Sequence, residues 1–196
     1  YIPESIAIPW TLVAERLGRP PTLAHASLVL NNWKQLEPNG SIKLGNLRTL
    51  IQFHGGLDES WFYLVTTEIE AIGAGVLKQF DCIQQAAHSD DFQQIEDSLE
   101  EVQESLVALN TTLNRMYENC DPYIFYNRIR PFLASFENIE YRGCKKNPRN
   151  YFGGSAAQSS LLQAIDAMFG IVHQEEQSRS YLVTMRNYMP TGHAAY

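Results

Sequence analysis

The sequence has no long apolar run and few basic residues, and both absences exclude classes of protein. No apolar run among the 196 residues reaches the roughly 18 that a membrane-spanning helix needs. Fifteen Lys and Arg stand against 22 Asp and Glu, which gives a formal net charge of −7. The one basic cluster runs from Arg142 to Arg149, and phosphate binding needs a broader basic face. We therefore expect neither a membrane segment nor a nucleic-acid partner.

Cysteine is also scarce. Cys82, Cys120 and Cys144 are odd in number, and no two of them form a Cys-x-x-Cys pair. This spacing indicates neither a disulfide framework nor a zinc site, and it fits a protein of the reducing cytoplasm. The sequence also starts without an initiator Met or a signal-peptide pattern, so we expect it to be part of a longer protein.

What is present is typical of one soluble helical domain. Hydrophobic residues make up 44% of the chain and charged residues 19%, and in most long segments the apolar positions recur three and four apart. This periodicity predicts an all-α fold with irregular connections. The predicted helices span residues 9–17, 22–36, 60–87, 90–116, 122–130, 161–172 and 179–189. Residues 41–57 are expected to be irregular or to hold a brief strand, and residues 137–150 a loop.

The two longest predicted helices carry distinctive patterns. Asp58 is expected to cap the first, and its Gly73 and Gly75 indicate that another helix or a planar ligand packs very close. Ser89 or Asp90 is expected to cap the second, whose apolar residues follow a heptad seam. The seam is compatible with a coiled coil or with packing inside a bundle.

Residues 151–160 read Tyr-Phe-Gly-Gly-Ser-Ala-Ala-Gln-Ser-Ser and precede the most apolar predicted helix. Two adjacent glycines allow positive φ or close approach to a flat ligand, and the serines can cap a helix. The pattern alone is compatible with a plain connection or with a ligand-binding loop. Asp166, in the helix that follows, needs a partner among so many apolar neighbours.

Phe125 and Arg130 are a second candidate pair, on an aromatic-rich segment. Five residues apart, they would lie near opposite sides of an ideal α-helix, unless Pro131 changes the local geometry. Arg130 is compatible with a surface position or with a buried carboxylate partner.

The run from Phe152 to Ser160, with Gln163 and Asp166, closely resembles the indoleamine 2,3-dioxygenase family of haem proteins, as do Met185-Arg-Asn-Tyr-Met-Pro190 and His193. Other stretches agree in the same order: Ile8-Pro9, Pro20-Pro21, Asn32-Trp33-Lys34, Phe62-Tyr63-Leu64-Val65 with Glu70, and Asp121-Pro122 with Phe125 and Arg130. The resemblance spans essentially the whole chain. It implies that residues 1–196 are part of a single helical, bundle-like catalytic domain. With haem b, such a domain adds both atoms of O₂ across the indole C2–C3 bond of L-tryptophan, a small-molecule substrate, and gives N-formylkynurenine.

The same resemblance assigns roles to residues of this chain. Phe125 would pack on the substrate indole, and Arg130 would bind its carboxylate. Asp166 would lie on the proximal side of the haem, near a propionate and an arginine. Two further sets are implied: a distal set of Phe62, Tyr63 and Thr66, and a loop over haem and substrate of Gly153, Gly154, Ser155 and Ala156.

Some positions depart from the family pattern. Tyr63 and Thr66 stand where the mammalian enzymes have Phe and Ser. His25 aligns with a mammalian tyrosine, and it is compatible with a hydrogen bond to the indole N–H or with a satisfied core histidine. The family's iron-ligating histidine has no counterpart here, since His193 matches a histidine that is not a ligand. We expect no metal ligand in this chain and the proximal histidine beyond Tyr196. The family's N-terminal small domain is missing too.

Two other functions stay open at this point. One is a haem protein that binds O₂ without dioxygenase activity, as in some molluscs that use this fold as an oxygen carrier. The other is a haem enzyme that acts on a modified tryptophan.

Overall fold

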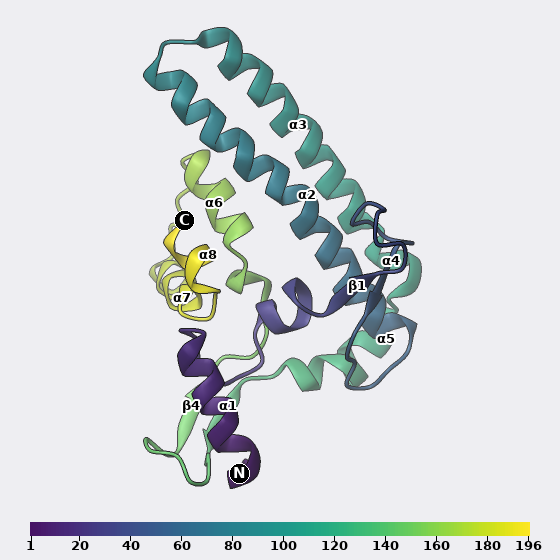
Figure 1. The fold of residues 1–196 in the computed structure, drawn as a ribbon, viewed down its shortest axis with the longest axis vertical. Helices are drawn as coiled ribbons and strands as arrows, with labels where there is room; N and C mark the ends of the chain where they lie inside the picture. Colours follow the sequence, from purple (N-terminus) through teal and green to yellow (C-terminus); the bar gives the residue numbers. More distant parts are fainter.

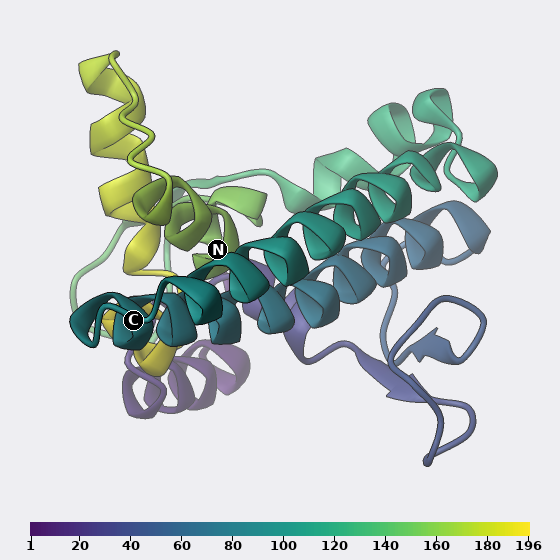
Figure 2. The same cartoon turned by 90° about the horizontal axis from the view of Figure 1, so that it is seen from above.

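The fold is built on two long antiparallel helices, α2 (Leu57–His88) and α3 (Phe92–Asn114), in a computed structural model that describes residues 1–196. Figures 1 and 2 show the two helices side by side along most of their length. Asp91 caps α3, because its Oδ1 accepts a hydrogen bond from the Gln94 N–H at 3.1 Å. The cap falls one or two residues after the predicted Ser89 or Asp90.

The middle of the α3 heptad seam packs on α2, whereas Phe92, Leu99 and Leu113 of the same seam are exposed. Val102 is buried against Val76, Phe80 and Ile83 of α2, and Ile165 packs on the same cluster from another helix. The all-α prediction is confirmed, with two small two-stranded sheets added to it. Gly56, rather than Asp58, precedes the first turn of α2. The Asp58 carboxylate instead accepts a hydrogen bond from the Asp121 N–H at 2.7 Å.

The predicted helix over residues 22–36 is wrong. The structure has a single π turn, η1 (Ala26–Leu30), followed by strand β1 (Trp33–Gln35), which pairs antiparallel with β2 (Leu47–Thr49). The Asn32 side chain explains the early end, because it bonds to both the N–H and the C=O of Ile51 at 2.9 Å. This pairing draws the chain out of helical geometry, and β2 confirms the brief strand expected in residues 41–57.

The first helix, α1 (Glu4–Arg16), begins five residues earlier than predicted, with Pro9 in its interior. Proline in a helix removes the bond to the carbonyl four residues earlier and crowds that carbonyl, which here belongs to Ser5 in the first turn. The predicted loop over residues 137–150 also contains structure: β3 (Phe136–Ile139) pairs antiparallel with β4 (Arg149–Tyr151).

The middle of the chain holds the short elements α4 (Met116–Asn119), α5 (Pro122–Ile124), the π turn η2 (Phe125–Ile129) and the 3₁₀ turn η3 (Arg130–Leu133). The last part contains the 3₁₀ turn η4 (Ala156–Gln158), α6 (Ser160–Met168), α7 (Glu176–Arg186) and α8 (Thr191–Ala195). Helix α6 ends before the predicted residue 172, because Gly170 has φ +65°.

Gly73 lets α6 approach α2 closely. A Cβ built at Gly73 would lie 2.8 Å from Leu161 Cγ and closer still to both Leu161 methyls, whereas a Cβ at Gly75 would meet nothing within 4 Å. Close helix packing therefore explains the first glycine. It does not explain the second.

Among all the helices, none combines the length and the apolar character that crossing a membrane requires.

Candidate active site

Phe125 and Arg130 lie one turn apart because the residues between them form a π turn. The Arg130 N–H donates to the Phe125 carbonyl, five residues earlier. In an α-helix two such residues would be about 140° apart, whereas a bond from i+5 to i brings them one turn apart. The ideal α-helix geometry therefore does not apply to this segment, and η2 is the physical reason.

This turn forms one side of a cavity of about 810 Å³. Another part of its wall comes from Phe62 on α2, whose ring centroid lies 4.3 Å from that of Phe125. The residues from Phe152 to Ala156 add a further part. The cavity thus brings together Phe62, Phe125 and Arg130 with the whole predicted glycine loop, from three regions far apart in sequence.

The protein's own packing requires the first glycine of this loop and leaves little room for a side chain at the second. A Cβ at Gly153 would collide with the Leu133 carbonyl oxygen and lie 2.7 Å from Ala134 C, and a Cβ at Gly154 would lie 2.5 Å from Leu28 Cδ1. The sequence suggested that small residues leave space for a ligand. In the structure the space that the missing side chains leave is filled by the backbone of residues 133–134 and by Leu28.

A buried polar network lies behind the glycine loop. The Gln158 side chain accepts a hydrogen bond from the His25 N–H at 2.8 Å and donates one to the Gly153 carbonyl at 2.8 Å. His25 Nε2 in turn lies 2.8 Å from Glu70 Oε1 on α2. Burial raises the pKa of the Glu70 carboxyl, but hydrogen bonds from His25 and Ser159 outweigh that effect and leave this pKa below its ordinary value.

Four predicted site residues do not line this cavity. His25 is 3% exposed and has Glu70 as its side-chain partner. Tyr63 is buried and donates its hydroxyl to Glu59 Oε1 at 3.2 Å, and this burial together with the nearby carboxylate raises its pKa. The Thr66 hydroxyl donates to the Phe62 carbonyl within α2 at 2.8 Å.

The fourth residue is Asp166. Its carboxylate lies 2.9 Å from His173 Nε2, and both side chains are partly exposed. The resemblance implies an arginine near this aspartate, whereas the ion-pair partner within this chain is a histidine.

Sequence reasoning missed several aromatic residues of the cavity wall. Tyr126, Phe152 and Tyr181 all line it, and the Phe152 and Tyr181 rings meet edge to face at 5.6 Å. Phe152 and Tyr126 are sequence neighbours of the predicted site residues Gly153 and Phe125, so the sequence could have indicated them. Tyr181 lies on the polar helix α7, and nothing in its sequence neighbourhood indicated a place at the site.

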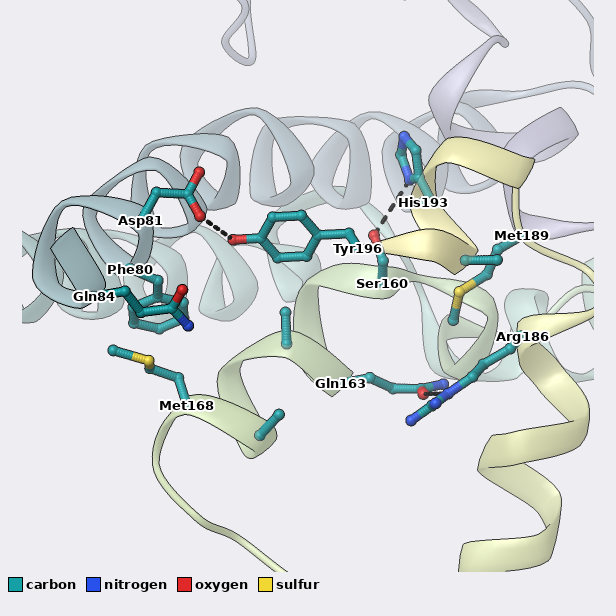
Figure 3. Close-up of a pocket in the computed structure, with 13 residues that line it drawn as sticks. Phe80, Asp81, Gln84, Ser160, Gln163, Met168, Arg186, Met189, His193 and Tyr196 are labelled. Carbon is teal, nitrogen blue, oxygen red and sulfur yellow. Dashed lines mark hydrogen bonds between the residues drawn. The ribbon is translucent and has the colours of Figure 1, made fainter. Parts of the chain in front are cut away.

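A second cavity, of about 530 Å³, lies between α2, α6 and the C-terminal helices (Figure 3). Tyr196 lies across it, with its hydroxyl 3.2 Å from Asp81 Oδ1, and the Arg186 Nε donates to Gln163 Oε1 at 2.9 Å. None of the predicted site residues lines it. We assign the candidate site to the first cavity, because only that one combines several aromatic rings, a guanidinium and a backbone wall.

The lining of the first cavity fits a flat aromatic body that carries a carboxylate. Aromatic rings and glycine backbone offer flat surfaces, and Arg130 is the one cationic side chain of the wall. This chemistry suits the edge of a porphyrin or an indole amino acid. The lining includes no histidine, cysteine or methionine, and no three His, Cys, Asp or Glu residues of the chain are grouped to hold a metal ion. The lining therefore offers no His, Cys or Met side chain as an axial ligand of a haem iron.

Comparison with known proteins agrees with the resemblance seen in the sequence. The family model described as "Indoleamine 2,3-dioxygenase" matches residues 1–196. The chain is 36% identical to human indoleamine 2,3-dioxygenase 2 and 35% identical to the indoleamine 2,3-dioxygenase of Saccharomyces cerevisiae. Both matches cover 100% of this chain and 49% and 48% of those proteins.

A relative with a different name is the myoglobin of Haliotis madaka, which is 30% identical over 98% of this chain and 51% of its own length. The chain thus spans about half the length of the curated relatives it matches. From the family match over its whole length, the chain belongs to the indoleamine 2,3-dioxygenase family.

Proposed function

We propose that the protein containing this chain is a cytoplasmic, haem b-dependent dioxygenase. It would insert both atoms of O₂ into the C2–C3 bond of L-tryptophan and release N-formylkynurenine. Family membership supports the reaction class. The observation that carries the substrate assignment is the placement of Phe125 and Arg130 one turn apart on a shared cavity wall.

Arg130 has the chemistry to hold the substrate carboxylate. A guanidinium forms two parallel hydrogen bonds to a carboxylate, and these charge-assisted bonds are about twice as strong as neutral ones. No carboxylate of the chain forms an ion pair with Arg130. Its guanidinium carbon lies 6.0 Å from the centre of the Tyr126 ring. Because the side chain is exposed and has no ion-pair partner, it is free to bind an acid from the cavity.

The aromatic residues would hold the indole. Phe62 and Phe125 lie against each other and line the same cavity as Arg130, so an indole in contact with them can keep its carboxylate near the guanidinium. Two points of contact fix the orientation of the ring, and such positioning is a large part of what a protein contributes to a reaction of this kind. Bound haem supplies the centre at which O₂ is activated.

A second function is favoured by one observation, the 30% identity to the Haliotis madaka myoglobin. A protein that only carries O₂ has no amino-acid substrate to bind, and the pairing of Phe125 with Arg130 supports the enzyme. To separate the two, L-tryptophan is added to the reduced, aerobic full-length protein, and the absorbance of N-formylkynurenine is followed. Turnover supports the dioxygenase, and O₂ binding without product supports the carrier.

Arg130→Ala tests the substrate assignment. We expect kcat/KM for L-tryptophan to fall roughly 100-fold, because two charge-assisted hydrogen bonds are lost, while haem content per protein stays the same. The measurement is steady-state turnover of the haem-loaded full-length protein, with haem quantified by its Soret absorbance.

Arg128→Ala is the matched control. Arg128 is an exposed arginine two residues away that does not line the cavity, so its loss should leave kcat/KM unchanged. If Arg130→Ala lowers turnover and haem content equally, or changes neither, Arg130 does not hold the substrate.

A further inference from the structure

We propose that Gln158 is a positioning residue whose buried amide sets the place of the glycine wall, defined as residues 153–155, relative to the rest of the cavity. This inference rests on the proposed function, since the substrate that the wall would face is an indole amino acid. Gln158 itself does not line the cavity. It acts through the backbone that does.

The Gln158 amide is fully engaged on both of its polar atoms and is 1% exposed. Its Oε1 accepts from the His25 N–H at 2.8 Å and from the Ser155 N–H at 3.4 Å, and its Nε2 donates to the Gly153 carbonyl at 2.8 Å. The opposite orientation of the amide would set an NH₂ group against two N–H donors, so the partners define a single orientation. One side chain therefore bonds to both ends of the glycine wall, by a short hydrogen bond at Gly153 and a long one at Ser155.

The wall has other contacts, but no other side chain bonds to the Gly153 carbonyl. Gly153 and Gly154 pack on residues 133–134 and on Leu28. The Ser155 hydroxyl accepts hydrogen bonds from the Ala157 N–H at 3.2 Å and from the Tyr181 hydroxyl at 3.3 Å. Residues 152–155 belong to no helix or strand. Just before the wall, the Phe152 N–H donates to the Tyr188 hydroxyl at 3.0 Å. Within it, the Gly153 N–H reaches the Ser135 hydroxyl at a long 3.4 Å. Without the Gln158 amide, the Gly153 carbonyl would lose its one side-chain partner, and a Gly-Gly backbone has wide conformational freedom.

The same amide connects the wall to α2. It bonds to the backbone of His25, whose side chain pairs with Glu70 on α2. Eight residues earlier, α2 also carries Phe62, another part of the cavity wall. The chain of contacts Gln158–His25–Glu70 thus ties the glycine wall to the helix that bears an aromatic ring of the site. Movement of the wall would change the space between that ring, Arg130 and a bound indole.

Gln158→Glu is the first test, in the haem-loaded full-length protein. Glutamate has nearly the same shape and retains an oxygen for the two N–H donors, but it puts a second oxygen against the Gly153 carbonyl. We expect KM for L-tryptophan to rise about tenfold with a smaller change in kcat, because the wall is misplaced while the reacting groups are intact. Hydrogen exchange of the peptide covering residues 152–157 should become faster. Gln93→Glu makes the same change at an exposed position of α3 and should leave all three quantities unchanged.

A second variant covers the case in which the buried charge prevents folding. Gln158→Met has a similar length without a charge, and it would lie beside Met185, whose sulfur is 3.8 Å from the Gln158 amide nitrogen. It should show the same rise in KM and the same faster exchange. The proposal is overturned if either folded variant retains the KM and the wall exchange of the parent, or if only thermal stability and haem content fall.

Failure of the proposed function would look different. If the parent protein does not convert L-tryptophan, the KM readout is lost, but hydrogen exchange still reports whether Gln158 holds the wall. Faster exchange in that case would support the positioning role and reject the substrate. If the parent converts L-tryptophan but hydrogen exchange of the wall is unchanged in the variants, the substrate is supported and the positioning role of Gln158 is rejected.

Discussion

The two halves of helix α2 differ in how far polar side chains contribute to their packing. Its C-terminal half lies against α3 and α6 through apolar side chains such as Val76, Phe80 and Ile83, at regular helical spacing. Its N-terminal half is surrounded by π turns, short strands and loops. There an apolar cluster of Leu64 and Val65 with Leu44 and Leu47 is joined by polar contacts. These come from the buried Glu59 and Thr67 and, farther along, from the partly buried Glu70. The candidate site lies beside the N-terminal half, which contributes Phe62 to it.

The difference shows how irregular chain can be held at a defined place. An amphipathic helix needs only an apolar stripe to pack, whereas a loop has unpaired N–H and C=O groups that need partners. In this protein one buried carboxylate or amide serves several loop residues at once. Glu59 accepts hydrogen bonds from the N–H groups of Phe53, His54 and Gly55 at 2.8 to 2.9 Å, as well as from Tyr63. Phe53 then stacks on Phe132, which lies in η3, the turn that begins at Arg130.

Removing Glu59 should therefore have the largest effect on stability. We expect Glu59→Ala to lower the free energy of unfolding of the full-length protein by about 3 kcal/mol or more, because three backbone donors and a buried hydroxyl lose their acceptor. Urea denaturation followed by circular dichroism measures it. Glu100→Ala, at an exposed position of α3, should change the free energy by less than about 0.5 kcal/mol. Similar values for the two variants would remove the contrast between the halves of α2.

The apolar half can be tested with its two glycines. Gly73→Ala should destabilise by roughly 1–3 kcal/mol, because the new methyl overlaps Leu161, which is 2% exposed and has little room to move. Gly75→Ala should stabilise by about 0.5–1 kcal/mol, because its Cβ meets nothing and alanine favours the helix. Thermal or urea unfolding of the two variants should give shifts of opposite sign. Equal shifts would contradict the close contact of α2 with α6.

The unfolding free energy should also depend on pH through Glu70 in the N-terminal half of α2. We expect this effect to be smaller than those of the Glu59 and glycine variants. The folded state holds the pKa of Glu70 below its ordinary 4.5, so folding favours the ionised carboxylate. The stability that this provides is present above pH 4.5 and is lost as the pH falls from there through the lower folded pKa. Glu70→Gln should therefore flatten the acid limb of the unfolding free energy measured between pH 7 and pH 3. An acid limb identical to that of the parent would exclude Glu70 as its source.

Sequence patterns predicted the regular half well and the irregular half poorly. The heptad seam located α3, and the long proline-free segment located α2, because apolar periodicity encodes a helix locally. The motif from Phe152 to Ser160 identified the family, and the family match confirms it. The helix expected over residues 22–36 failed because Asn32 pairs with Ile51, a contact nineteen residues away that periodicity does not reveal.

The site shows the same division. The sequence indicated the residue types of the site: an arginine on an aromatic segment, two adjacent glycines, and an aspartate in an apolar helix. Their arrangement was not. A π turn puts Phe125 and Arg130 on one cavity wall, the backbone of residues 133–134 fills the space beside Gly153, and a buried glutamine joins the glycine wall to His25. Each of these depends on hydrogen bonds and packing between segments far apart in sequence, which local propensity does not encode and which form only when the chain has folded.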